Sequence, residues 1–459
     1  MTPKERYQEL KHYLAAENPV LLEVMKKYET LDSIAHELGI LPEEKSYTDD
    51  ISWWPLISIL GTFSAGKSTF INNYLGKKVQ QSGNQAVDDK FTVLCYGENE
   101  EPMTLPGLAL DADPRFPFYN ISDEVEKVDK GEGSRVNLYL QLKTVKAENL
   151  KGKILIDSPG FDADSQRDAI LRITSHIVGM SDLVLIFFDA RHPEPGAMRD
   201  TLEHLVGHTM NYRDSDKILY ILNQIDTTAK EDNLEEVMGA WQRALSQRGL
   251  VAGDFYAIYN EDARNPIEDP AVAERLKRKR DEDWKRIIDR MEGVQIERAY
   301  RISKALEDYA KAIHRDRLPT LDKALRRWGR NVFLSDLLLF VVLASSLSYM
   351  ALVGMLSSPE LLIPVLSAVL VILAAAHFKA KQFFARREIK KLKEKDSVLA
   401  TAVERQTRWY RSVLGAWRGS WVEKIQRRLA GIIDDSRAAI RRLNDQYVRP
   451  GGASKEMED

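Results

Sequence analysis

Residues 61–68 read Gly-Thr-Phe-Ser-Ala-Gly-Lys-Ser and match the pattern G-x-x-x-x-G-K-[ST] at every position. The apolar run Leu-Ile-Ser-Ile-Leu (56–60) precedes this segment, and the helix-like stretch Thr-Phe-Ile-Asn (69–72) follows it. A strand, a glycine-rich loop and a helix in this order let backbone N–H groups turn around phosphate oxygens. The sequence therefore predicts a phosphate-binding loop inside an α/β domain.

The residue types in the loop predict which side chains bind phosphate and which bind metal. Lys67 neutralises the β- and γ-phosphate oxygens, and the Ser68 hydroxyl binds Mg²⁺. The alternative, a glycine-rich turn with an incidental lysine, is weakened by the strand before the loop and the helix after it. The residues that we expect to contact the nucleotide here are Gly61, Thr62, Phe63, Ser64, Ala65, Gly66, Lys67, Ser68 and Thr69.

Two further elements follow in the order that a GTPase requires. Asp157-Ser-Pro-Gly160 comes after the apolar run 153–156, where the carboxylate of Asp157 can hold the magnesium through water and the N–H of Gly160 can meet the γ-phosphate. Ser68 and Asp157 are therefore the predicted metal-binding residues. On its own, the D-x-x-G element is also compatible with an ordinary turn at a strand end.

The second element, Asn223-Gln-Ile-Asp226, ends the apolar run 217–222. It corresponds to the guanine-reading pattern N-K-x-D, in which the aspartate accepts hydrogen bonds from N1–H and N2–H₂ of the base and the asparagine braces the loop. Gln224 stands in the place of the lysine whose stem packs on the base. We therefore expect Mg²⁺ with GTP, and ATP remains an alternative.

Short apolar runs separated by helix-like stretches indicate the fold class. Continuous runs such as Leu-Val-Leu-Ile-Phe-Phe (183–188) are typical of strands buried on both faces, as in a parallel sheet covered by helices. We predict an α/β P-loop domain over 51–267 with a mostly parallel sheet. The expected strands are 56–60, 91–96, 136–142, 153–158, 182–190, 217–223 and 255–259.

The remainder of the chain has a helical pattern. We expect helices over 1–50, a charged helical segment over 268–332 that is broken at Pro319, and basic helices over 379–449. The helices from the two ends could fold together into a stalk. The last segment, 450–459, has the composition of a disordered tail.

An uncharged region separates these helices. Residues 337–356 hold no charge, and neither do residues 361–376. Twenty residues rise about 30 Å as a helix, which is the thickness of the hydrocarbon core of a bilayer. Lys and Arg flank both runs and none lies in the turn 357–360, so the positive-inside rule predicts a membrane hairpin over 333–378, with the nucleotide domain on the cytoplasmic side. The alternative is an antiparallel helix pair buried in a soluble domain.

Composition limits the other classes of function. The 66 Lys and Arg nearly balance the 69 Asp and Glu, so no overall positive charge favours nucleic acid as a partner. The only cysteine, Cys95, excludes an intramolecular disulfide and a metal cluster built on cysteines.

The phosphate loop resembles that of dynamin-superfamily GTPases, G-x-x-S-[AT]-G-K-[ST]. The chain is most similar to the EH-domain-containing dynamin-like ATPases over about residues 55–262. The segments that carry this likeness, besides the nucleotide motifs, are Leu105-Pro-Gly107, Asp113-Pro-Arg-Phe-Pro-Phe118, Phe188-Asp-Ala190 and Leu205-Val-Gly-His208. The resemblance implies a G domain with a helical stalk, binding to a lipid bilayer, and a homodimer or higher oligomer formed through the G domain and the stalk.

The chain departs from that family in three ways. It contains no EH-like module, so peptide recognition by such a module is not carried over. It carries a long apolar segment in place of a short lipid-contacting tip. Aligning Phe91 with the switch phenylalanine of the family places Asp88 where a catalytic, magnesium-contacting threonine is expected, with Thr92 nearby. The resemblance also implies that Ser64 helps to position water across a dimer, so the candidate catalytic residues are Ser64, Lys67, Asp88 and Thr92.

These observations predict a membrane-anchored dynamin-like nucleoside triphosphatase. Nucleotide binding and hydrolysis would be coupled to dimerisation of the G domain and to membrane remodelling. A membrane-anchored regulatory switch without remodelling and an ATP-specific enzyme remain the alternatives.

Overall fold

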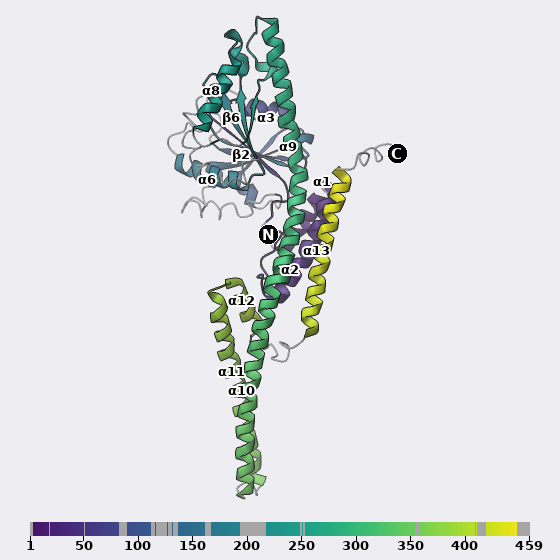
Figure 1. The fold of residues 1–459 in the computed structure, drawn as a ribbon, viewed down its shortest axis with the longest axis vertical. Helices are drawn as coiled ribbons and strands as arrows, with labels where there is room; N and C mark the ends of the chain where they lie inside the picture. The colour runs from purple at the N-terminus through teal and green to yellow at the C-terminus, as the bar shows by residue number, and fades with distance from the viewer. Residues whose placement is uncertain are drawn as a thin grey trace, which may run out of the picture. The chain divides into compact units, whose positions relative to one another are not determined.

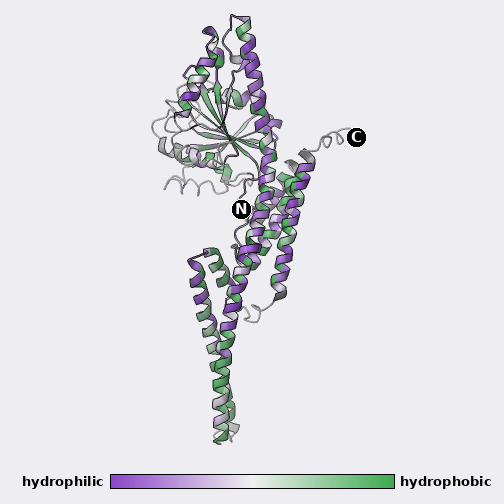
Figure 2. Ribbon diagram, viewed as in Figure 1, coloured by the Kyte–Doolittle hydropathy of each residue, from purple (hydrophilic) through white to green (hydrophobic). Residues whose placement is uncertain are grey.

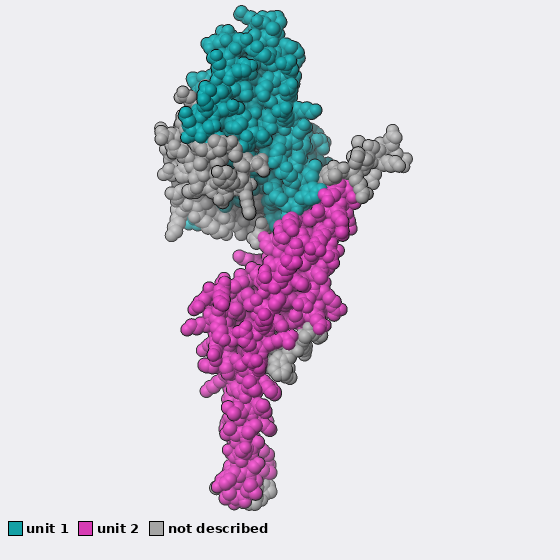
Figure 3. Space-filling view, in the orientation of Figure 1, with its two compact units in different colours: residues 1, 3–21, 51–301 teal, residues 2, 22–50, 302–459 magenta. Residues whose placement is uncertain are grey.

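The computed structural model describes the chain in two compact units, coloured separately in Figure 3. One unit contains residues 3–21 and 51–301, and the other contains residues 22–50 and 302–459. The domain boundaries expected from the sequence remain predictions. The residues that the structure does not describe are 1–2, 18, 50, 82–89, 112–114, 116–125, 127–130, 132–135, 161–166, 193–216, 248–249, 251–252, 354–358, 409, 411–418 and 448–459.

The first unit is built on a mixed sheet. Figure 1 shows this sheet and the helices beside it. Within the described residues, its eight strands follow the order β3-β4-β2-β5-β1-β6-β7-β8. All neighbours pair in parallel except β2 with β5 and β3 with β4, so the prediction of a mostly parallel sheet is confirmed. The strands are β1 (Leu56–Gly61), β2 (Phe91–Tyr96), β3 (Met103–Pro106), β4 (Leu140–Val145), β5 (Ile154–Asp157), β6 (Leu183–Asp189), β7 (Ile218–Asn223) and β8 (Asp254–Ala257).

Helices cover both faces of this sheet. Every residue of β1, β6 and β7 is buried, as the continuous apolar runs predict. On one face, Phe70 packs against Phe187 of β6 and against Trp284, with ring centroids 5.0 and 5.1 Å apart. On the other face, Trp241 packs edge-on against Phe188. The helices that bear these residues are α3 (Lys67–Leu75), α9 (Pro270–Ala312) and α8 (Leu234–Ser246).

Further short elements complete the first unit. Its remaining helices are α1 (Pro3–Glu17), α5 (Val136–Tyr139) and α6 (Arg167–Met180), and its 3₁₀ turns are η1 (Gly107–Asp111), η3 (Glu148–Leu150), η5 (Ile225–Lys230) and η6 (Glu261–Ala263).

Two details of the predicted sheet are wrong. Residues 136–139 form the helical turn α5, and the strand expected at 136–142 begins only at Leu140. Val136 and Tyr139, three residues apart, are both buried, and a short apolar run cannot be assigned to strand or helix by periodicity alone. The edge strand β3 was not predicted, because its partly exposed residues form no apolar run.

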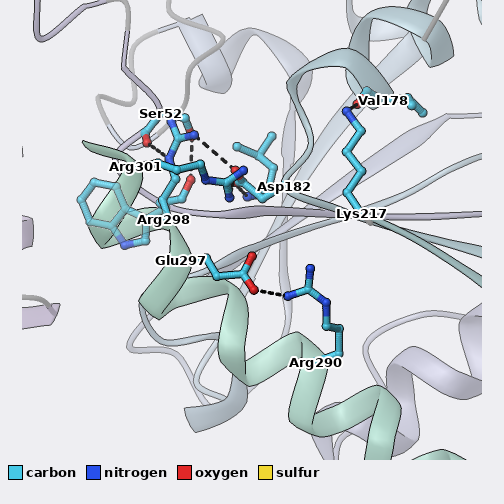
Figure 4. A network of polar contacts seen from close by, with 10 residues as sticks. Ser52, Val178, Asp182, Lys217, Arg290, Glu297, Arg298 and Arg301 are labelled. Carbon is cyan, nitrogen blue, oxygen red and sulfur yellow. Dashed lines mark hydrogen bonds and ion pairs between the residues drawn. The ribbon is translucent and has the colours of Figure 1, made fainter. Parts of the chain in front are cut away.

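An ionic anchor ties α9 to the starts of two central strands (Figure 4). Arg298 and Arg301 lie 3.2 and 2.5 Å from Oδ1 of the buried Asp182, which immediately precedes β6. The second oxygen of Asp182 accepts the backbone N–H of Leu56, the first residue of β1, over 2.9 Å. Arg298 Nε also donates to the carbonyl of Ser52 over 2.6 Å. The strand that leads into the phosphate loop is thereby fixed at its start.

The second unit is helical. Its elements are most of α2 (Pro19–Leu38), the end of α9, the π-helical segment η7 (Ile313–Arg317), α10 (Leu318–Leu352), α11 (Pro359–Lys393), α12 (Ser397–Gln406) and α13 (Gly419–Tyr447). Tyr28 of α2 donates to the carbonyl of Ile302 over 2.9 Å, and Ser436 of α13 donates to the carbonyl of Ser303 over 2.6 Å. Segments from both ends of the chain therefore pack on α9.

The expected break at Pro319 is absent. Residues 318–352 form one helix in which Pro319 occupies the first turn. A proline inside a helix removes one backbone N–H donor, and its ring crowds the carbonyl of the preceding turn. The π-helical segment directly before it, Ile313–Arg317, keeps the chain helical between α9 and α10.

The two apolar runs lie on α10 and α11, which run side by side (Figure 1) and are apolar towards their joined ends (Figure 2). Both helices are long and apolar enough to cross a membrane, by length and composition. In the most apolar stretch of each, only 6% and 0% of the residues are buried. Within the part of the chain that the structure describes, these side chains are therefore not the core of a soluble domain. The apolar residues exposed on this pair are Phe333, Leu334, Leu337, Leu338, Phe340, Val341, Val342, Tyr349, Leu352, Val353, Leu361, Leu362, Ile363, Leu366, Leu370, Val371, Ile372, Phe378 and Phe383.

At the start of the apolar pair, specific contacts join the two helices. Trp328 of α10 is buried and donates its indole N–H to the carbonyl of Lys381 over 3.1 Å. Asp336 Oδ2 lies 2.7 Å from Nδ1 of His377. These polar contacts set the register between the helices, which the apolar stretches alone leave open.

Candidate phosphate and base site

The glycine-rich loop joins the end of β1 to the start of α3. Ser64 and Gly66 both adopt positive φ, 58° and 86°. A Cβ atom on Gly66 would lie 2.1 Å from Nδ2 of Asn223, so the close approach of that side chain requires glycine. The loop is therefore curled by its own backbone and held by the neighbouring strand end.

Lys67 lies against the inner side of this loop. Its side chain is 8% exposed, and Nζ donates to the carbonyl oxygens of Gly61 and Thr62 over 2.9 and 3.1 Å. A buried ammonium group needs such partners to compensate for lost hydration. The charge of Lys67 is thus held at the loop that the sequence assigned to phosphate.

The helix that follows the loop is fixed by a polar cluster in which Tyr74 and Lys153 are buried and Glu292 is half exposed. Tyr74 of α3 donates to Oε1 of Glu292 on α9 over 3.1 Å, and Lys153 Nζ lies 2.8 Å from the same oxygen. Burial raises the pKa of the Tyr74 phenol and lowers the pKa of the Lys153 ammonium group. This cluster ties the end of the phosphate-loop helix to α9.

Asp157 lies at the end of β5, beside the loop. β5 pairs directly with β1 in the register Ile59↔Asp157, and the side chain of Asp157 is buried. Ser68 lies in the first turn of α3, where the loop ends. Gly160 lies next to Phe63, because a Cβ atom on Gly160 would be 3.2 Å from the Phe63 Cβ. Both parts of the D-x-x-G element thus flank the loop.

These residues fit a magnesium ion shared with phosphate. Ser68 offers a hydroxyl and Asp157 a carboxylate, which are the hard oxygen donors that Mg²⁺ prefers, and Mg²⁺ usually takes one or two protein ligands besides phosphate and water. Among the described residues, no group of three or more His, Cys, Asp or Glu side chains is placed to hold a metal by itself. The donor set therefore suits an ion that arrives with a nucleotide.

Asn223 and Gln224 connect the end of β7 to the phosphate loop. Asn223 Nδ2 donates to the carbonyl of Ala65 over 2.9 Å, and Gln224 Nε2 donates to the carbonyl of Ser64 over 2.6 Å. Gln224, at φ 64°, thus takes a bracing position in place of the expected lysine. Asp226 follows in η5, and its side chain is buried.

The structure describes only some of the candidate catalytic residues. Thr92 is buried in β2, opposite Asp157 in the antiparallel pair, and its hydroxyl accepts a hydrogen bond from Gln141 over 2.8 Å. Ser64 offers its carbonyl to Gln224, as described above. Asp88 lies outside the described residues, as do 205–208 and all of 113–118 except Arg115. The catalytic roles of Ser64, Lys67, Asp88 and Thr92 remain predictions.

Three residues of the site carry no sequence motif. Gln80 and Lys143, both buried, form a chain of hydrogen bonds that ends on Asp157, and Asn265 contacts Asp226. Gln80 lies 77 positions from Asp157, Lys143 lies 63 positions from Gln80, and Asn265 lies 39 positions from Asp226. Nothing in their local sequence marks them, so only the fold identifies them.

Comparison with known proteins agrees with this geometry. Residues 57–225 match the family model described as Dynamin family. EH domain-containing protein 2 of Rattus norvegicus is 29% identical over 216 residues, which are 44% of this chain and 35% of that protein. The probable transmembrane GTPase FZO-like, chloroplastic, of Arabidopsis thaliana is 24% identical over 252 residues, which are 55% of this chain and 23% of that protein. The chain thus spans about a third or less of the length of these relatives.

A solved structure also aligns over most of the chain. It is described as an oligomerised bacterial dynamin pair that provides a mechanism for the long range sensing and tethering of membranes. The alignment covers 97% of this chain and 80% of that chain, at 16% identity and a TM-score of 0.38. A similarity this low supports no inference about function.

Proposed function

Because residues 57–225 place its nucleotide domain in the dynamin superfamily, we propose that this chain is a membrane-anchored nucleoside triphosphatase that binds GTP with Mg²⁺. Hydrolysis would be coupled to dimerisation of the G domain and to membrane remodelling. The supporting observation is the meeting of three strand ends, those of β1, β5 and β7, around one glycine-rich loop. In parallel sheets, ligands bind at the carboxyl ends of the strands.

The geometry suggests how a triphosphate is held. Its β- and γ-oxygens would replace the carbonyl oxygens of Gly61 and Thr62 as partners of Lys67. The first backbone N–H groups of α3, which begins directly after the loop, would donate to the same phosphates, because the N–H groups in the first turn of a helix have no partner within that helix. Ser68 and Asp157 would hold Mg²⁺, which neutralises charge on the phosphates when it is bound. The N–H of Gly160 would approach the γ-phosphate.

For hydrolysis we propose a site that is completed by a second copy of the chain. Ser64, on the loop, and the segment around Asp88 and Thr92 are the candidates for orienting water. Asp226 would read the base, and we propose GTP as the favoured nucleotide because a carboxylate matches the two donors of guanine. The glutamine at position 224 keeps ATP as the alternative.

The apolar pair α10 and α11 supports a membrane anchor. Its apolar side chains face outwards, and no other described part of the chain covers them. Two such helices expose a larger continuous apolar surface than a soluble protein usually does. We propose that residues 333–378 insert into a lipid bilayer from the cytoplasmic side. Basic residues just before the first apolar run and just after the second, such as Arg330 and Lys379, would remain with the nucleotide domain on that side.

The proposed domains follow from this assignment. They are a G domain over 51–267, a stalk over 1–50, 268–332 and 379–449, the hairpin 333–378 and the tail 450–459. The chain would form a homodimer or higher oligomer through the G domain and the stalk. A helical stalk that could act as a lever favours a mechanical role, because a regulatory switch would not need such a stalk.

Nucleotide turnover with and without liposomes tests the proposal. We expect the full-length protein, in mild detergent, to hydrolyse GTP and to turn over faster after reconstitution into vesicles, because membrane attachment concentrates G domains for dimerisation. Lys67→Ala should abolish turnover in both settings. If the wild-type protein hydrolyses no triphosphate, the proposed enzymatic activity is refuted. If its turnover rate is the same with and without vesicles, only the proposed coupling to lipid is refuted.

A further inference from the structure

The base-reading aspartate is already occupied by a neighbour in this fold. Asn265 lies in the segment between η6 and α9, and it donates two hydrogen bonds to Asp226. Its backbone N–H reaches Oδ2 over 2.7 Å, and its side-chain Nδ2 reaches the same oxygen over 2.8 Å. Both donors therefore converge on one carboxylate oxygen.

This arrangement conflicts with full recognition of guanine. An ionised carboxylate offers about four lone-pair sites, two on each oxygen, so two donors fill Oδ2 of Asp226. A guanine read by both oxygens places N1–H on one and the N2 amino group on the other. One donor of Asn265 must then withdraw. Adenine has no N1–H and gains nothing from the carboxylate, so Asn265 does not compete with it.

We propose that Asn265 is a specificity-determining residue, whose side-chain amide competes with guanine for Asp226 and lowers the preference for GTP over ATP. This inference rests on the proposed function, since it requires a nucleotide base at Asp226. Asn265 is exposed while Asp226 is buried, so the amide can swing into solvent at little cost when guanine enters. The backbone N–H of Asn265 stays in place, and it leaves one lone pair of Oδ2 for the base.

A bracing role for Asn265 predicts a different result. If the side chain only fastens its own segment, its removal weakens binding of every nucleotide by a similar factor. If it competes with guanine, its removal strengthens GTP binding and leaves ATP binding unchanged. The ratio of the two dissociation constants separates these cases, and the absolute affinity does not.

Competition experiments on the full-length protein with Mg²⁺ provide the test. A fluorescent triphosphate analogue is displaced by GTP, by ATP and by XTP, for the wild type and for Asn265→Ala. The substitution removes one hydrogen bond of ordinary strength, so the ratio Kd(ATP)/Kd(GTP) should rise about fivefold. Xanthine lacks the N2 amino group, so the affinity for XTP should change less than that for GTP.

A matched control is available shortly before this segment, at the start of η6. Asn260 is also an asparagine, and its side chain accepts the N–H of Asp262 over 2.9 Å without contacting Asp226. Asn260→Ala should leave the ratio unchanged. In the background Asp226→Ala, Asn265→Ala should likewise have no effect on the ratio, because the shared acceptor is gone.

The outcomes distinguish this inference from the proposed function. An Asn265→Ala protein that binds GTP and ATP with an unchanged ratio overturns the role of Asn265 and leaves the nucleotide site intact. Wild-type protein that binds neither nucleotide overturns both. If Asn265→Ala does not fold, Asn265→Ser, which shortens the side chain and keeps it polar, must give the same rise in the ratio.

Discussion

Gln80 Nε2 donates a hydrogen bond to Oδ2 of Asp157 over 2.6 Å. The other end of the same amide, Oε1, accepts from Lys143 Nζ on β4 over 2.6 Å. Asn72 of α3 holds the backbone of Gln80 through its own side chain, accepting the N–H over 2.8 Å and donating to the carbonyl over 2.8 Å. The predicted magnesium carboxylate is thus oriented by a buried glutamine that is anchored on the phosphate-loop helix.

Gln80→Leu should weaken the response to magnesium. Leucine keeps much of the volume but removes the donor that orients Asp157, and loss of a partner behind a metal ligand typically lowers metal affinity by roughly 10-fold or more. We expect the Mg²⁺ concentration for half-maximal GTP hydrolysis to rise by about that factor. Gln81→Leu, at the adjacent exposed glutamine, is the control. Lower thermal stability with an unchanged Mg²⁺ midpoint would assign Gln80 a purely structural role.

Lys67→Ala should weaken nucleotide binding strongly. The substitution leaves the charge on the β- and γ-phosphates without its ammonium partner, and a charge-assisted hydrogen bond contributes about 1.5–3 kcal/mol, so affinity should fall at least about 10-fold. Titration of a fluorescent triphosphate measures this directly. Lys78→Ala, an exposed lysine after α3, should bind normally. Equal affinity of the Lys67→Ala and wild-type proteins would show that the loop is not the phosphate site.

The apolar hairpin should behave as an integral anchor. Full-length protein in vesicles should resist extraction by high salt and by alkaline carbonate, because apolar insertion, unlike attraction to headgroups, is not screened by ions. Removal of residues 333–378 should release the protein into solution and leave GTP binding intact, since the predicted G domain ends at residue 267.

Point substitutions provide the control for this deletion. Ile363 and Leu370 are 69% and 70% exposed, so replacing both by arginine removes little packing. An arginine at the centre of a bilayer costs about 2.5–3.5 kcal/mol, and the double variant should lose its resistance to carbonate. A wild-type chain that is soluble and monomeric without detergent, or that salt alone releases, would contradict membrane insertion.

Asp182→Ala should loosen the start of β1. The substitution leaves the Arg298 and Arg301 guanidinium groups without their shared buried carboxylate, and breaking a buried pair in this way costs about 3–5 kcal/mol. The loss of stability should lie at the lower end of this range, because the side chain of Arg301 is half exposed. Hydrogen exchange at residues 56–61 should become faster. The control is Asp289→Ala, at an exposed position of α9, the helix that bears both arginines, and it should leave hydrogen exchange at residues 56–61 unchanged. A similar acceleration of exchange in both variants would refute the anchor.

Glu307 should make the helical unit sensitive to acid. Hydrogen bonds from Lys311 and Lys304, with a further one from Arg437 of α13, lower the pKa of Glu307 from its usual 4.5 to about 2. The unfolded chain therefore binds more protons between these values, so the stabilisation is complete above about pH 4.5 and is lost as the pH falls towards 2.

The measurement compares the free energy of unfolding of the wild type and Glu307→Gln at several pH values. The difference between the two proteins should shrink steadily as the pH falls from about 4.5 towards 2. Asp308→Asn, at a more exposed neighbour that also contacts Lys304, should show a smaller pH dependence. A difference that is constant over this range would mean that the carboxylate charge of Glu307 does not stabilise α9 against α13.

Much of the fold followed from patterns that are local in the chain. The phosphate loop at 61–68 carries its own conformation, because glycine at position 66 permits the positive φ that the curl needs. The buried strands at 183–189 and 218–223 were predictable because strands covered on both faces exclude polar residues. The two apolar helices were equally predictable, because their length and their lack of charged residues can be read from the sequence without knowing what packs against them.

Tertiary structure alone decided the remainder. The contacts Gln80–Asp157 and Asn265–Asp226 join residues 77 and 39 positions apart, and they depend on strand register and on the course of the connecting segments. The helical turn at 136–139 and the continuous helix through Pro319 likewise depend on which neighbours bury the side chains and on where the helix turn begins. Periodicity records which face of an element is buried, but it does not record which polar groups meet across elements. The sequence by itself therefore determined the loop, the buried strands and the apolar pair, whereas packing decided which groups orient the proposed metal carboxylate and which groups cover the aspartate that is proposed to read the base.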